Sequence, residues 1–251
     1  MTETGRHGTL VGSKDRSPRL VSERLAVVSV LVLVMVVTGV PYLYGLVTCP
    51  SDKVFLGLLG PYGNDQAFYL GWGPKQAEAG NLLFEDKYNG HTDTRLVFNP
   101  LWLLMGWAAR LTGLSVLLVF HLERAAFSML LLAQAYAILS RFLDGLRWRI
   151  AALWLVAFSS GFGVLGVPLS DWTASNGTYR VPAGRWTPDL WVAESNTFLI
   201  MLGELVLPAA MALFLMTIRH GVGTFWDERR SAVRTGLLTL LLGTIYPYAV
   251  V

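Results

Sequence analysis

Two charged residues combine a chemically useful side chain with a position beside long apolar segments. Asp65 follows the first of these segments and precedes Phe68 and Tyr69. A carboxylate held there could accept a proton as a general base, although Asp is also a favoured residue for capping the start of a helix. Arg124 lies inside a later apolar segment. A guanidinium is costly in that setting, and it could bind a phosphate group through paired hydrogen bonds.

Arg124 also has structural alternatives. It could form an internal ion pair with His121 or Glu123, or extend its side chain towards the membrane surface. Glu123 is a poor partner, because adjacent residues of a helix point in different directions. Phosphate binding is therefore the role that we expect for Arg124.

Several acidic residues could add to a site. We expect Asp93, Asp171 and Glu194 to help bind a substrate, although Glu194 could equally be a solvated residue that flanks a membrane span. Glu204 lies six residues inside an apolar segment. A carboxylate there must be protonated or find a partner, so it could serve a site, a proton pathway or a contact between helices.

The sequence gives no support to a metal site. The four histidines do not have the spacing of metal ligands, and Cys49 is the only cysteine. A divalent cation would be compatible with the acidic residues, but no pattern requires one, and no cofactor is predicted.

Composition places the chain in a membrane. Of the 251 residues, 53% are hydrophobic and 15% are charged, against about 25% charged in an average soluble domain. The basic residues lie between apolar segments instead of forming a stripe interleaved with aromatic residues, which argues against nucleic acid as a partner. We therefore predict an all-α, polytopic membrane protein whose partner is the lipid bilayer.

The apolar segments predict five to six helices. Five of them are long enough to cross a membrane, at 25–47, 114–139, 150–168, 198–218 and 235–251. The sixth, 98–109, has only 12 residues and suits an interfacial or re-entrant helix, with two full crossings between 95 and 141 as the alternative. We expect 1–24 to be a disordered cytoplasmic tail and 25–251 to be the membrane domain. The chain ends within an apolar segment, so we expect it to be the first part of a longer protein.

The distribution of charge predicts the topology. Segments 1–24, 141–149 and 219–234 are basic, whereas 50–97 has six acidic residues against four basic ones and 169–197 has three against two. Lys and Arg favour the cytoplasmic side of a membrane. This places the N-terminus in the cytoplasm, and it places segments 50–97 and 169–197 on the outer face of the plasma membrane. Segment 50–97 should contain an amphipathic helix that starts at Asn64 or Asp65.

Three motifs, taken in order, resemble those of the membrane-embedded GT-C glycosyltransferases. In the mannosyltransferase and aminoarabinose-transferase branches they read roughly D-E-x-x-Y, then H-P-P-L, then an Arg before small residues in a span. The corresponding segments here are Asn64-Asp65-Gln66-Ala67-Phe68-Tyr69, Phe98-Asn99-Pro100-Leu101 and His121-Leu122-Glu123-Arg124-Ala125-Ala126-Phe127-Ser128. The chain departs from these patterns in having one acidic residue at Asp65 and an Asn at 99.

This resemblance implies a GT-C-like fold and a transferase that uses a polyprenyl-phosphate-linked sugar on the outer face of the membrane. Asp65 would then activate the acceptor hydroxyl, and Arg124 would bind the phosphate of the donor. Two other classes stay open. Charged residues within spans, together with many glycines, also suit a transporter or channel component, and the single acidic residue of the first motif leaves room for a non-catalytic assembly protein.

The predicted topology can be tested with single cysteines in a background from which Cys49 has been removed. Cysteines placed at Asn89 and Ser175 should react with an impermeant thiol reagent in intact cells, because both segments are expected outside. A cysteine at Gly145 should be protected. The reverse pattern, with Gly145 labelled and both others protected, would overturn the assignment.

Overall fold

The computed structural model describes residues 16–58, 63–85, 95–159, 196–224 and 229–247, which are mostly helical. Two short strands, β1 (Phe84–Glu85) and β2 (Arg95–Val97), pair antiparallel as a small addition to the expected all-helical chain. The helices are α1 (Arg16–Thr48), α2 (Gly63–Glu78), α3 (Pro100–Thr112), α4 (Val116–Phe142), α5 (Leu146–Ala157), α7 (Thr197–Gly203), α8 (Val206–Thr224) and α9 (Arg229–Ile245).

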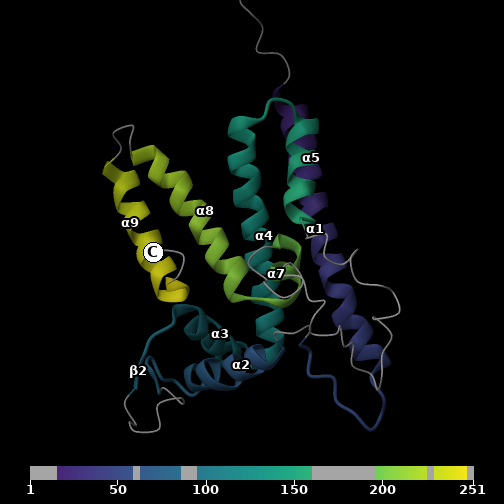
Figure 1. Cartoon of the computed structure of the whole chain (residues 1–251), viewed down its shortest axis with the longest axis vertical. Coiled ribbons are helices and arrows are strands. Elements are labelled where there is room, and N and C mark those ends of the chain that lie inside the picture. Colours follow the sequence, from purple (N-terminus) through teal and green to yellow (C-terminus); the bar gives the residue numbers. More distant parts are fainter. Residues whose placement is uncertain (1–15, 59–62, 86–94, 160–195, 225–228, 248–251) are drawn as a thin grey trace, which may run out of the picture.

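The long helices run together along one axis, and a pair of helices crosses one end of them. Helices α1, α4, α5, α8 and α9 extend along the vertical direction of Figure 1, whereas α2 and α3 lie beneath them and run across that direction.

Two helices of the described chain are long and apolar enough to cross a membrane. These are the segment Val21–Thr48 of α1, with 28 residues, and α4, with 27 residues. The exposure of α1 distinguishes it from the core helix of a soluble protein, because Val28, Val32, Val36 and Val40 are each more than half exposed. Such a row of apolar side chains suits contact with lipid, and the two helices indicate that the protein associates with a membrane.

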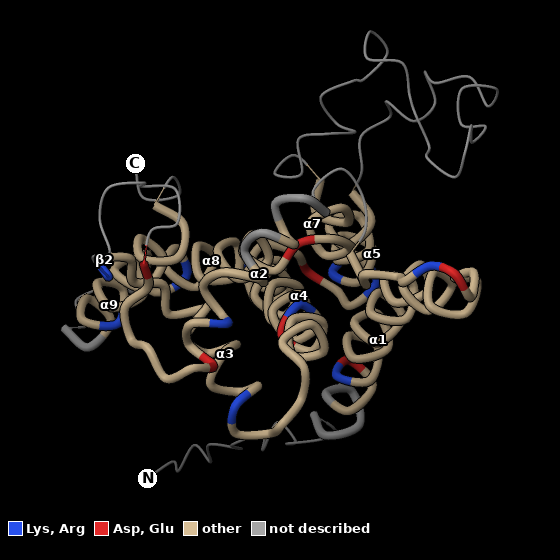
Figure 2. The backbone as a smooth tube through the Cα atoms, turned by 90° about the horizontal axis from the view of Figure 1, so that it is seen from below, with Lys and Arg blue, Asp and Glu red and all other residues tan. Residues whose placement is uncertain are grey.

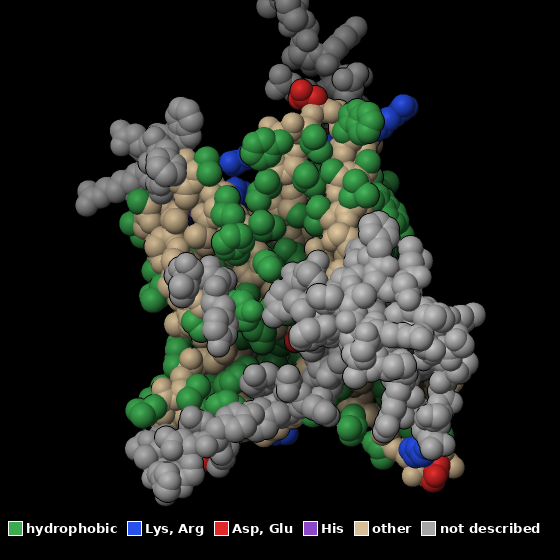
Figure 3. Space-filling model, viewed as in Figure 1, with side chains coloured by type: hydrophobic (Ala, Val, Ile, Leu, Met, Phe, Trp, Pro, Cys, Tyr) green, Lys and Arg blue, Asp and Glu red, His purple; other side chains and the backbone are tan. Residues whose placement is uncertain are grey.

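Apolar side chains are also exposed on the other long helices. Figure 3 shows hydrophobic side chains over much of the visible face of the helix bundle, with most of the visible charged side chains near its upper and lower ends. This distribution matches a bilayer, where the apolar middle is bounded by two polar surfaces.

Buried side chains form two main clusters that share α4 and α8. One cluster joins these two helices to α3 and α9, and the other joins them to α1, α5 and α7. A third, smaller cluster contains Trp72, Ala77, Phe84, Trp102 and Leu103, and it holds α2, α3 and the hairpin together. Helices α4 and α8 are therefore the two elements that both clusters have in common.

Helix α3 corresponds to the short apolar segment, and its boundaries have clear causes. The side chain of Asn99 accepts hydrogen bonds from the backbone N–H groups of Leu101 and Trp102, at 3.0 and 3.2 Å, which makes it the N-cap. Pro100 occupies the first helical position, where its missing N–H costs nothing. Gly113 ends the helix with a φ of 73°. The Asn that departs from the transferase motif thus has a structural role.

Four of the expected segments differ from the helices observed. Helix α9 begins at Arg229 instead of 235, within the connection expected over 219–234. Helix α1 begins at Arg16, so 16–24 are helical instead of belonging to the polar tail; Pro18 falls in the first turn, where proline is tolerated. The segment 198–218 is divided into α7 and α8 instead of forming one continuous helix. Helix α5 ends at Ala157, and the rest of 150–168 is described only to residue 159.

The contact between α2 and α3 depends on the absence of a side chain at Gly106. A Cβ atom there would lie 2.4 Å from both the Cβ of Ala77 and the carbonyl oxygen of Pro74, so the two helices would have to move apart. Gly71 offers a matched control, because it lies in α2 and a Cβ built on it meets nothing within 4 Å.

We predict that Gly106→Ala lowers the free energy of unfolding by roughly 1–3 kcal/mol, as expected when a well-packed contact is overfilled. Gly71→Ala should leave stability unchanged or raise it by up to about 1 kcal/mol, because Ala favours a helix more than Gly does. Thermal unfolding of both variants in the same detergent measures the difference. Equal stability of the two variants would contradict the close contact.

Candidate functional site

A buried polar region of the described chain lies where α7 ends. A helix that continued from α7 into α8 would bring the ring of Pro208 against the carbonyl of Glu204, four residues earlier. The chain instead breaks after Gly203 and starts α8 at Val206, so that Pro208 falls in a first turn. This break leaves the last carbonyl groups of α7 without donors from their own helix, and buried carbonyls need partners.

Three side chains from three other helices supply those donors. Arg124 of α4 donates from Nη1 to the carbonyl of Met201 at 2.6 Å, and Tyr42 of α1 donates from its hydroxyl to Leu202 at 2.5 Å. Gln66 of α2 donates from Nε2 to the carbonyl of Gly203. We call Tyr42, Gln66, Arg124, Glu204 and the three carbonyls the α7 junction.

Arg124 is enclosed within this junction. The residue is only 5% exposed, and its guanidinium carbon lies 4.7 Å from the centre of the Tyr42 ring, which permits a cation–π interaction. Its positive charge also lies at the C-terminal end of α7, where the helix dipole favours a cation. Within the described chain, Nε of Arg124 has no hydrogen-bond partner. One donor of the guanidinium is therefore unused.

These contacts test the alternative roles that the sequence left open for Arg124. In the described residues Arg124 forms no ion pair with His121 or Glu123; His121 instead bonds to the carbonyl of Gly57 at 2.9 Å. The guanidinium is enclosed by the protein, because Arg124 is a buried residue. Phosphate binding by Arg124 stays a prediction, and it must now be reconciled with a structural role at the end of α7.

Gln66 connects the junction to α2. It is 4% exposed, and its Nε2 lies 3.0 Å from Oε1 of Glu204 in addition to its bond with Gly203. Asp65, the predicted base, directly precedes Gln66 as the third residue of α2. The helix expected here is confirmed, and Asp65 lies in its first turn. Seen from below, acidic and basic residues lie close together where α2, α4 and α7 meet (Figure 2).

The other predicted binding residues cannot be placed. Asp93, Asp171 and Glu194 lie outside the described residues. Sequence reasoning also missed Tyr42 and Gln66. A partial signal for them is Pro208, because a proline inside an apolar segment can interrupt the helix and expose carbonyls that require polar partners.

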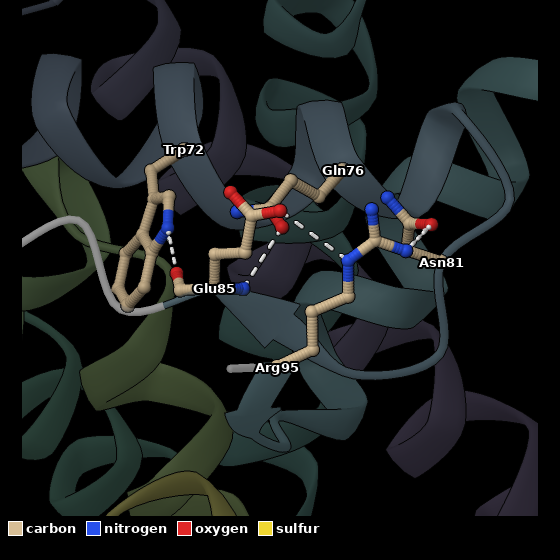
Figure 4. Close-up of polar contacts among 5 residues, drawn as sticks. All are labelled: Trp72, Gln76, Asn81, Glu85 and Arg95. Carbon is tan, nitrogen blue, oxygen red and sulfur yellow. Dashed lines mark hydrogen bonds and ion pairs between the residues drawn. The ribbon is translucent and has the colours of Figure 1, made fainter. Parts of the chain in front are cut away.

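A second candidate region lies along α2. A cavity of about 470 Å³ is lined by Ala67, Gly71, Trp72, Lys75, Gln76, Ala79 and Asn81. We call it the α2 groove. The hairpin of β1 and β2 borders it, and its polar contacts are drawn in Figure 4.

Hydrogen bonds fix this hairpin against α2. Trp72 donates from its indole to the carbonyl of Glu85 at 2.5 Å, and the side-chain oxygen of Gln76 accepts from the Glu85 N–H at 2.9 Å. Arg95 donates to the Asn81 side chain at 2.7 Å and lies 3.4 Å from the carboxylate of Glu85. The groove therefore has a rigid border that carries amides, an indole and charges of both signs.

Known proteins give no guidance on either region. Comparison of the chain with protein-family models, with curated proteins and with solved structures yields no match. Among the described residues there is also no group of three or more His, Cys, Asp or Glu side chains that could hold a metal ion.

The α7 junction predicts a difference between two tyrosines of α1. Tyr42→Phe should lower the free energy of unfolding by about 1 kcal/mol, because the carbonyl of Leu202 loses its donor. Tyr44→Phe is the control, since Tyr44 is 68% exposed and should change stability by less than about 0.5 kcal/mol. Thermal or urea unfolding in detergent would compare them, and a Tyr42→Phe variant as stable as Tyr44→Phe would show that the hydroxyl contributes nothing.

Proposed function

We propose that this chain is the membrane domain of a glycosyltransferase that moves a sugar from a polyprenyl-phosphate donor to an acceptor hydroxyl. The reaction would take place on the extracytoplasmic face of the plasma membrane. In this proposal the fold is GT-C-like with five to six membrane helices, the N-terminus is cytoplasmic, and 50–97 and 169–197 are outside.

One observation carries the proposal. Arg124 and Gln66, which are far apart in the sequence, bind carbonyls two residues apart at the end of α7. Because Asp65 adjoins Gln66 in α2, the predicted base and the predicted phosphate ligand belong to the same end of the molecule. The proposed sugar transfer needs a carboxylate that activates the acceptor hydroxyl and a nearby cation that binds the phosphate of the donor.

The region around Arg124 and α2 offers surfaces for the polyprenyl tail, the phosphate and the acceptor. Leu118 and Leu122, one turn apart on α4, are 44% and 54% exposed and give the polyprenyl tail an apolar surface near Arg124. The unused Nε of Arg124 offers a donor to the phosphate. The α2 groove would receive the acceptor, with Asp93, Asp171 and Glu194 completing the substrate site.

A transporter is the second candidate, and the break between α7 and α8 favours it. Discontinuous helices in transporters place a charged or polar residue at a break within the membrane, and here Glu204 lies at such a break and bonds to Gln66. A transferase needs the Asp65 carboxylate as its general base, whereas the transporter hypothesis does not. Replacement of Asp65 therefore distinguishes the two functions.

We predict that Asp65→Asn reduces sugar transfer by roughly 10²- to 10⁴-fold, the usual contribution of a general base. The substitution keeps the size of the side chain but removes its charge, which in the first turn of α2 also interacts favourably with the helix dipole. The assay follows transfer of labelled sugar from a polyprenyl-phosphate donor in membranes that contain the protein, with unfolding temperature measured in parallel.

Asp52→Asn is the control, because Asp52 is exposed and lies before α2. A second variant, Arg124→Lys, keeps the charge but loses the planar fork of donors, and should raise the apparent KM for the donor. Turnover of Asp65→Asn within about threefold of wild type, well below that catalytic range, would refute the base and favour the transport reading.

A further inference from the structure

A second cavity is lined by residues of α1, α4 and α5. The ends of these helices that carry it lie at the end of the molecule opposite α2 and α3 (Figure 1). The cavity has a volume of about 580 Å³ and opens where the start of α1, the last turns of α4 and the first turn of α5 meet. Its lining includes Arg24, Val27 and Val28 of α1, Tyr136 and Ser140 of α4, and Arg149 of α5. The transferase site uses none of these residues.

Arg149 is fixed in this cavity by two of its nitrogens. Its Nη1 lies 3.0 Å from Oε1 of Glu23, and its Nε donates to the carbonyl of Leu143 at 2.8 Å. Tyr136 donates its hydroxyl to the same Glu23 oxygen, so the carboxylate is also held. A guanidinium has five N–H donors. Those that remain on Arg149 are pre-positioned for a ligand, and its side chain is 24% exposed.

The lining carries one uncompensated positive charge. Glu23 is the acidic residue of the lining and balances one of the two arginines, Arg24 and Arg149. Arg24 is exposed and forms no ion pair with any residue that the structure describes. A ligand with a single negative charge, such as a phosphodiester, would neutralise the cavity, and arginine donors match phosphate oxygens in geometry.

An apolar track leads away from the cavity along α1. Val28 lines the cavity, and Val32, Val36 and Val40 follow at intervals of four residues, which places them on one face of the helix. Each is more than half exposed, from 52% to 56%. At 1.5 Å per residue the row extends about 18 Å, close to the thickness of about 15 Å for one leaflet of the hydrocarbon core.

We propose that this cavity binds the phosphodiester headgroup of a membrane phospholipid that carries one net negative charge. Arg24 and Arg149 contact the phosphate, and an acyl chain lies along the valine row of α1. The valine row favours a lipid over a free phosphate ion, because a free ion would use only the headgroup end of this surface.

The test measures lipid binding to the full chain purified in detergent. Phosphatidylglycerol should raise the unfolding temperature more than phosphatidylcholine with the same acyl chains, since only the first has a net charge. Arg24→Gln should weaken the apparent affinity for phosphatidylglycerol about tenfold, the loss expected for one hydrogen bond to a charged group. Because Arg24 has no partner in the described chain, its replacement should leave the fold intact, which circular dichroism checks.

Arg147→Gln is the matched control, because Arg147 is an exposed arginine at the same end that does not line the cavity. Its affinity for phosphatidylglycerol should stay within about twofold of wild type. Equal weakening in both variants would reduce the effect to general surface charge and overturn the proposal. Two other results would also overturn the proposal. One is equal stabilisation of the protein by phosphatidylcholine and phosphatidylglycerol, and the other is displacement of the lipid by millimolar inorganic phosphate.

Discussion

The end of α7 sets the constraint on which the arrangement of the other helices depends. The chain breaks after Gly203, which puts Pro208 in the first turn of α8 and leaves the carbonyls at the end of α7 without internal donors. In a poorly hydrated interior each unpaired carbonyl is costly, so partners must come from elsewhere in the chain. Tyr42, Gln66 and Arg124 meet this demand, and doing so brings α1, α2 and α4 to one point.

This constraint changes how a buried arginine should be interpreted. By its position in an apolar segment, Arg124 suggests a ligand, and the structure shows a protein carbonyl as one of its partners. The two roles are compatible, because a guanidinium can bind the α7 end with one edge and leave another donor for a phosphate. The hydrogen bond from Arg124 to the α7 carbonyl would also hold the guanidinium in the orientation that phosphate binding requires. In other binding sites, supporting hydrogen bonds orient the ligating side chains in the same way.

Much of the helical architecture could be predicted from the sequence, because apolar segments and their flanking residues determine where helices form. The helix after Gly63 and the short helix over 98–109 were predicted on that basis. The division of 198–218 was not predicted, because a proline inside an apolar segment does not always break a helix: α1 continues through Pro41. The junction was also beyond prediction, because a Tyr, a Gln and an Arg are brought together by packing between segments far apart in the chain. The same holds for the α2 groove, whose border forms only when the hairpin folds back on α2.

Two polar residues fix helix α1 near its ends, while its middle makes apolar contacts. Glu23 bonds to Arg149 and Tyr136, and Tyr42 bonds to the end of α7. The two residues are 19 positions apart, a rise of about 28 Å and close to the thickness of a hydrocarbon core. Because each residue of a helix turns by about 100°, one residue inserted between these contacts would rotate one of them away from its partner. The length of α1 between Glu23 and Tyr42 is therefore fixed to the residue, even though most of the side chains along it could be exchanged for other apolar ones.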